Sequence, residues 1–113
     1  MKKLFSISLM LGVLLSSCER IPDARFTVNA PTVQPGDVII FTNMSVDAVS
    51  YEWDFDDGYF STAKNPSHSY EEEGVYTVVL TVESHDGKID RTSKTIEVIY
   101  TELEIEVIEY NDD

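Results

Sequence analysis

Apolar side chains recur at every second position through most of this chain, and that period constrains its fold more than any other feature. Successive side chains of a strand point to opposite faces, so alternation predicts strands buried on one face. No apolar stripe with the 3.6-residue period of a helix is sustained. The alternating sets are Phe26/Val28, Ile39/Phe41, Tyr51/Trp53/Phe55, Tyr76/Val78/Leu80/Val82 and Ile96/Val98/Tyr100. The chain is therefore predicted to be all-β.

Turn-forming residue pairs separate the predicted strands. They are Pro35-Gly36, Asp57-Gly58, Asn65-Pro66 and Asp86-Gly87. Each pair supplies either a fixed φ or a residue that tolerates positive φ. Strands and turns at this spacing predict an antiparallel β-sandwich, with six or seven strands in the roughly 75 residues between Arg25 and Tyr100. A chain of 113 residues accommodates one such domain.

The amino terminus has the pattern of a secretory signal. Lys2 and Lys3 precede an uncharged, mostly apolar run over 4–15, and two serines follow before Cys18. Twelve residues are too few to cross a bilayer core of about 30 Å, which takes about 20 helical residues. Residues 15–18 (Leu-Ser-Ser-Cys) resemble the lipobox of bacterial lipoproteins. That resemblance implies a signal peptide over 1–17, lipid on the sulfur and amino group of Cys18, and a lipidated tether over 18–24.

A free secreted thiol at Cys18 is the alternative to lipidation. A lone cysteine in an exported chain has no disulfide partner and would be reactive, which favours the lipid anchor. With the cysteine used in this way, no disulfide stabilises the domain, so its stability depends on the apolar core.

The charge balance argues against nucleic-acid binding. The chain has 8 Lys and Arg against 21 Asp and Glu, a formal net charge of −13. Cleavage before Cys18 removes two lysines and no acid, which leaves 6 bases against 21 acids and a charge of −15. Such a surface repels phosphate backbones.

Three segments match the PKD domain in order and spacing. They are 51–58 (Tyr-Glu-Trp-Asp-Phe-Asp-Asp-Gly), 65–70 (Asn-Pro-Ser-His-Ser-Tyr) and 74–82, which begins Gly-Val-Tyr. Residues 25–100 resemble this family. The resemblance implies an immunoglobulin-like β-sandwich with an extracellular, non-catalytic role in adhesion, spacing, or protein or carbohydrate contact. It implies structural roles for Tyr51, Trp53, Asp54, Phe55, Asp57, Gly58, Pro66, His68, Tyr70, Gly74 and Tyr76.

The same residues can be interpreted from their chemistry. Tyr51, Trp53 and Phe55 share one strand face and should enter the core, while Asp54 on the other face can accept hydrogen bonds. His68 and Tyr70 each have an apolar body and a polar edge, and are expected to close their loop against the acidic turn. The family usually has glycine at position 56; if that position has positive φ, aspartate tolerates it better than most side chains.

Catalysis is not expected from these residues. Only His68 and His85 are available as imidazole bases; His68 occupies a structural motif position, and His85 adjoins a predicted hairpin turn. A nucleophile, a base and an orienting group are not recognisable as a set. No cofactor is predicted, and no Cys/His spacing fits zinc.

Calcium binding is the main alternative chemistry. Asp54, Asp56 and Asp57 cluster in the 51–58 segment, and three glutamates follow at 71–73. Carboxylate oxygens suit Ca²⁺, but the pattern lacks the alternating ligands of an EF-hand loop. The sequence predicts a solvated acidic rim and no metal site, with a Ca²⁺-stabilised module as the alternative.

The carboxy-terminal residues 101–113 form an acidic tail with its own alternation. Leu103, Ile105 and Val107 alternate with glutamates, and their phase is shifted by one residue from that of Ile96 and Val98. This pattern predicts an extra strand over 102–110 that pairs with the sandwich or with a partner.

Together these features predict a lipid-anchored lipoprotein of the cell envelope, at the outer membrane or cell surface. Its membrane contact is the N-terminal lipid, and its ligand is a protein or a carbohydrate. The alternative is a structural subunit of a surface assembly that pairs through its C-terminal strand.

Overall fold

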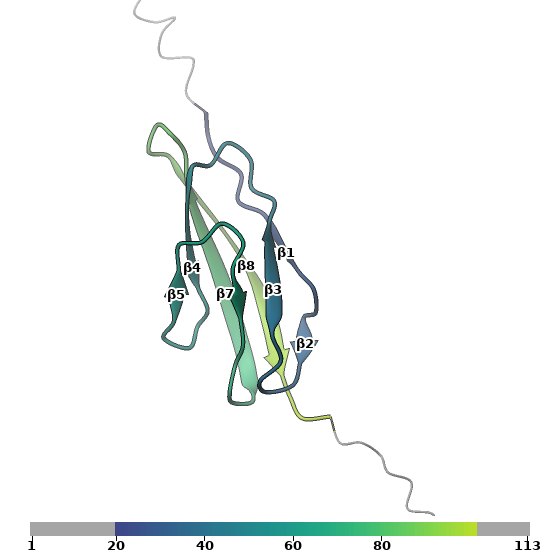
Figure 1. Ribbon diagram of the computed structural model, residues 1–113. Helices are drawn as coiled ribbons and strands as arrows, with labels where there is room; N and C mark the ends of the chain where they lie inside the picture. The colour runs from purple at the N-terminus through teal and green to yellow at the C-terminus, as the bar shows by residue number, and fades with distance from the viewer. Residues whose placement is uncertain (1–19, 102–113) are drawn as a thin grey trace, which may run out of the picture.

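The computed structural model describes residues 20–101, and it confirms an all-β sandwich of two sheets (Figure 1). The smaller sheet has the order β1-β3-β6, with β1 (Phe26–Val28), β3 (Ile39–Asn43) and β6 (Ser67–His68). The larger sheet has the order β2-β8-β7-β4-β5, with β2 (Thr32–Val33), β4 (Ser50–Asp54), β5 (Phe60–Ser61), β7 (Gly74–Glu83) and β8 (Ile89–Val98). The signal peptide, Cys18 and the predicted strand over 102–110 lie outside the described residues.

The β7–β8 hairpin is the longest paired element. It is in register from Gly74↔Val98 to Glu83↔Ile89, and its turn contains Gly87 at φ 83°. Positive φ is readily accessible to glycine, which explains the Asp86-Gly87 turn signal. The alternation on β7 is as predicted, because Val78, Leu80 and Val82 are buried. This hairpin provides the centre of the larger sheet.

The core lies between the two sheets and is built from the alternating residues. Phe26 and Phe41 of the smaller sheet face Trp53 of the larger one, with ring centroids 5.0 and 5.5 Å from the indole. The buried apolar residues are Ala24, Phe26, Ile39, Phe41, Trp53, Phe55, Tyr70, Val78, Leu80, Val82, Ile96 and Val98. Burial of these side chains is the main stabilising contribution, as expected for a domain without a disulfide.

The strand count and directions differ from the prediction. The described residues contain eight strands, not six or seven, because β2, β5 and β6 have only two residues each and show no alternation. The sandwich is also not purely antiparallel: β2 pairs parallel to β8, with Thr32 opposite Glu97. The chain leaves the smaller sheet after β1 and continues in the same direction along the edge of the larger sheet.

The predicted buried position of Tyr100 is wrong. β8 ends at Val98, opposite Gly74, the first residue of β7. Within residues 20–101, no strand pairs with the chain beyond Val98, and Tyr100 is exposed.

The segment expected to be a tether is packed on the sandwich from residue 20 onward. Asp23 and Val46 exchange two backbone hydrogen bonds of 2.9 Å, and the amide of Ala24 donates to Asp90 Oδ2 at 2.8 Å. Pro22 and Ala24 are buried. Within residues 20–101, no helix has the length and hydropathy required to cross a membrane.

Candidate functional site

The motif residues meet in a continuous stack of rings. Trp53 is stacked on Phe55, whose ring lies 4.1 Å from that of His68 and nearly parallel to it. Tyr70 meets His68 edge-on at 4.8 Å, and its other side is stacked on Tyr76 at 4.0 Å. The stack therefore links β4, β6, the β6–β7 loop and β7 across one end of the sandwich.

Two polar contacts fix this stack to the turn after β4. His68 Nε2 lies 2.7 Å from Asp57 Oδ2, and the Tyr70 hydroxyl donates to the Phe55 carbonyl at 2.8 Å. Burial, reinforced by the nearby charges of Asp57 and Asp56, raises the pKa of Tyr70 well above its usual range. The hydroxyl therefore remains protonated and able to donate at physiological pH. The structure brings His68 and Tyr70 against the acidic turn.

The three carboxylates of the acidic turn accept hydrogen bonds from nearby backbone amides. Asp54 Oδ1 accepts from the amide of Asp56 at 3.0 Å, and Asp57 Oδ1 accepts from that of Tyr59 at 3.1 Å. Asp56 Oδ2 accepts from the amide of Thr77 on β7 at 3.0 Å. Across residues 20–101, no group of three or more His, Cys, Asp or Glu side chains is arranged to hold a metal ion. The turn geometry gives no support to the calcium alternative.

Asp56 occupies the position at which the family usually has glycine. Its φ is 67°, in the left-handed region that side chains other than Asn and Asp rarely adopt. Its carboxylate caps the Thr77 amide on the part of β7 that extends beyond β4. Aspartate therefore tolerates the strained backbone and supplies a hydrogen bond that glycine cannot make.

Substitutions at Asp56 should separate these two contributions. Asp56→Ala is expected to lower the free energy of unfolding by about 2 kcal/mol, since it loses the hydrogen bond and retains the left-handed strain. Asp56→Gly should lose only about 1 kcal/mol because it relieves that strain, and Asp56→Asn should remain close to the parent protein. Urea unfolding followed by circular dichroism measures the order. An alanine variant as stable as the parent would contradict this account.

The remaining motif residues have local structural contacts. The Tyr51 hydroxyl donates to the Ala48 carbonyl at 3.2 Å, and the buried Pro66 accepts a hydrogen bond from the Phe41 amide at 3.0 Å. The Tyr76 ring lies over Gly74, where an added Cβ would be 3.4 Å from its carbons. Gly58, at φ 91°, completes the acidic turn.

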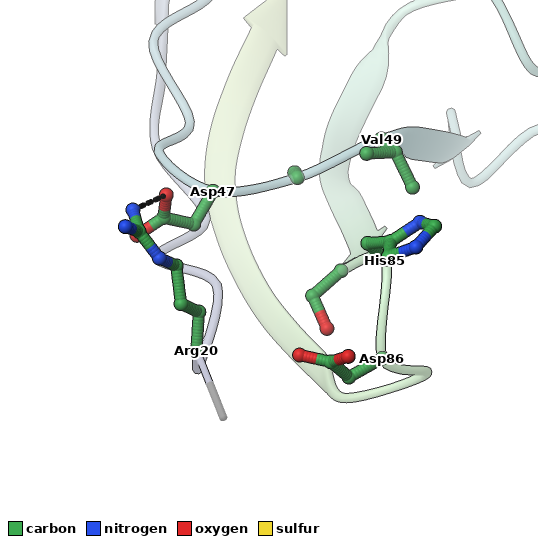
Figure 2. A pocket seen from close by; sticks show the side chains of 7 residues that line it. Arg20, Asp47, Val49, His85 and Asp86 are labelled. Carbon is green, nitrogen blue, oxygen red and sulfur yellow. Dashed lines mark hydrogen bonds and ion pairs between the residues drawn. The ribbon is translucent and has the colours of Figure 1, made fainter. Parts of the chain in front are cut away.

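His85 lies at the opposite end of the sandwich, exposed in the β7–β8 hairpin as predicted. It borders an open hollow of about 370 Å³ that is also lined by Arg20, Asp47, Val49 and Asp86 (Figure 2). The imidazole of His85 points away from the Asp86 carboxylate in Figure 2. The neighbouring Ser84 hydroxyl accepts a hydrogen bond from the Lys88 amide at 3.1 Å. The hollow does not align a nucleophile with a base.

The sequence pattern did not predict two sets of contacts, one in the core and one at the end of the sandwich opposite the ring stack. Phe26 and Phe41 pack on Trp53, although their short alternating sets identified them only as core candidates. Arg20 forms an ion pair with Asp47 at 3.2 Å, 27 residues away. A long-range surface pair of this kind leaves no periodic signal.

Comparisons with known proteins agree with this geometry. A family model described as the PKD domain matches residues 20–99. The collagenase ColQ1 of Bacillus cereus is 50% identical over 50 residues, which cover 44% of this chain and 5% of that protein. The pre-pro-metalloprotease PrtV of Vibrio cholerae is 38% identical over 81 residues, which cover 68% of this chain and 8% of that protein. This chain therefore spans less than a tenth of the length of either relative.

Solved structures show the same sandwich. A chain from a study of carbohydrate-binding modules of the β-sandwich superfamily matches with a TM-score of 0.67 and 29% identity, covering 70% of this chain and 34% of that one. The PKD1 domain of Vibrio anguillarum Epp matches with a TM-score of 0.62 and 36% identity, covering 70% of this chain and 94% of that one. The sandwich is thus a known architecture, and this chain belongs to the PKD-domain family.

Proposed function

We propose that this protein is a lipid-anchored module of the cell envelope, in which the PKD domain acts as a binding or spacer unit at the outer membrane or cell surface. The PKD domain itself is a non-catalytic module. The observation that carries the proposal is the placement of the chain ends: residue 20 and residue 101 leave the sandwich at opposite ends (Figure 1). A domain with this geometry would hold the membrane contact at one end apart from a partner bound at the other end.

The anchor is proposed at Cys18. The apolar run ends at a lipobox-like Leu-Ser-Ser-Cys sequence, and the cysteine is the only one in the chain. Several acyl chains, at about 0.8 kcal/mol per buried methylene, make such an anchor effectively permanent. The tail over 102–110 is proposed to face a protein or carbohydrate partner at the other end, and strand pairing there would make the protein a structural subunit.

The anchor is tested by replacing the cysteine. Cys18→Ala is expected to move the protein almost completely from the detergent phase to the aqueous phase in detergent phase separation of whole cells, because the acyl chains are lost. Intact-mass spectrometry of the parent protein should show the added lipid. Ser17→Ala, which retains the cysteine and a small neighbour, is the matched control and should remain in the detergent phase.

A mature Cys18→Ala protein that is unlipidated and still partitions with the membrane would defeat the anchor proposal. That result would leave the domain as a binding or spacer module held to the envelope by another contact.

A further inference from the structure

The end of the sandwich from which residue 20 emerges is here named the anchor-side end. It consists of the segments 20–25, 44–49 and 84–88, which lie beyond the same ends of the strands (Figure 1). Segment 62–66, which runs alongside β3 and is hydrogen-bonded to Asn43 at the end of that strand, is included with them. The antiparallel register places them together, because β4 begins and β7 ends at the pair Ser50↔Glu83. The opposite end carries the acidic turn and residues 99–101.

The chain is held firmly at the anchor-side end. Arg20 is paired with Asp47 at 3.2 Å, and the double backbone bridge between Asp23 and Val46 follows three residues later. Only Glu19 separates Arg20 from Cys18. Because an extended residue spans at most about 3.6 Å, the two-residue step from Arg20 to Cys18 can cover at most about 7 Å. A lipid on Cys18 would therefore keep the anchor-side end close to the bilayer surface.

This end has several exposed aliphatic side chains, as do β3 (Ile40) and the opposite end (Val38, Val75 and Ile99). Ile21 is 74% exposed, Val49 is 63% exposed, and Met44, Val46 and Ile89 are each more than half exposed. The segments 20–25 and 44–49 are joined by the pairing of Val46 with Asp23, and the Val49 amide donates to the carbonyl of Glu83, which is opposite Ile89 where β7 ends and β8 begins. Val49 and Arg20 also border the hollow drawn in Figure 2. The aliphatics therefore belong to one end surface.

Charge distinguishes the two ends. The four segments of the anchor-side end contain Arg20, Arg25, Lys64 and Lys88 against three acids, Asp23, Asp47 and Asp86. The segments at the opposite end, 29–38, 55–59, 69–73 and 99–101, contain six acids and no lysine or arginine. An anionic lipid surface repels the opposite end more strongly than the anchor-side end, whose four bases slightly exceed its three acids.

We propose that the anchor-side end docks on the lipid bilayer surface, with Ile21, Val46 and Val49 at headgroup level. The sandwich then stands upright, and its acidic end with residue 101 points away from the membrane. The bilayer is the partner of this end because the chain between the lipid anchor and Arg20 is only two residues long. The difference in charge between the two ends favours contact through the anchor-side end. The inference rests on the lipid anchor proposed above and adds the orientation of the domain.

The orientation can be tested without relying on lipidation in the cell. The mature chain is coupled through its single thiol, Cys18, to a maleimide lipid in nanodiscs of phosphatidylethanolamine and phosphatidylglycerol that contain a gadolinium-chelate lipid. Methyl relaxation is then measured by NMR. Val46, Val49 and Ile89 are expected to relax at least several-fold faster than Val75, which is 66% exposed and lies at the opposite end, opposite Glu97.

Matched substitutions test the apolar contact itself. Val49→Glu should reduce the enhancement at Val46 and Ile89 several-fold, whereas Val75→Glu, on an equally exposed valine, should leave it unchanged. Equal enhancement at Val75 and Val46, or a larger one at Val75, overturns the upright orientation. If the enhancement is absent and sedimentation shows self-association that depends on Val49, the proposal is overturned. The anchor-side end would then bind a second copy of this chain. A failure of native lipidation appears only in the mass of the cellular protein, so it is distinguished from a failure of docking.

Discussion

Replacing Trp53 with alanine is expected to lower the free energy of unfolding by about 3–5 kcal/mol. The indole is completely buried, touches the rings of Phe26, Phe41 and Phe55, and donates from Nε1 to the Ala63 carbonyl at 2.8 Å. The substitution therefore removes burial, leaves a cavity between the sheets and leaves a carbonyl without its donor. Domains are stable by only about 5–15 kcal/mol, so this loss threatens folding itself.

Two controls separate the contributions of Trp53. Trp53→Phe retains a ring in the core and loses the indole donor, and it should be clearly less destabilised than Trp53→Ala. Val75→Ala, on the exposed face of β7, should change stability by less than about 0.5 kcal/mol. Urea unfolding is followed by circular dichroism, because the two Trp53 variants lack the tryptophan fluorophore. In the parent protein, a Trp emission maximum typical of full solvent exposure would contradict the burial.

The period-two pattern located β4, β7 and most of the core, but within the ten-residue β8 it marked only Ile96 and Val98. Val78, Leu80 and Val82 on β7 alternate strictly because one face of that strand is buried, and burial is the property that alternation encodes. The same rule identified Trp53, whose neighbours two residues away are aromatic. It placed Asp54 on the opposite face, where the carboxylate accepts a backbone hydrogen bond.

Features that depend on short or long-range contacts were not accessible in this way. β2, β5 and β6 have two residues each, too few to show a period. The docking of the 20–24 segment depends on the bond from the Ala24 amide to Asp90, which is 66 residues away. The charge pattern also could not distinguish an acidic turn that binds a cation from one whose carboxylates cap backbone amides, because both require the same residues.

The pairing of His68 with Asp57 should also contribute strongly to stability. His68→Ala is expected to lower the free energy of unfolding by about 2–4 kcal/mol. The change removes a ring stacked on Phe55 from the middle of the aromatic stack. It also takes the partner from the Asp57 carboxylate, a side chain that is only 19% exposed. The Tyr59 amide still donates to Oδ1, but losing the second donor is costly for a carboxylate that is mostly removed from water.

Partial replacements distinguish stacking from the hydrogen bond. His68→Phe retains the ring and removes the nitrogen, so it should lose about 1–3 kcal/mol because Asp57 Oδ2 alone loses its partner. Combining Asp57→Ala with His68→Ala in a double-mutant cycle should yield a coupling of about 1 kcal/mol or more, because the two side chains lie in direct contact. Strict additivity would mean that the 2.7 Å contact contributes nothing, and His68 would then stabilise the acidic turn only through its ring.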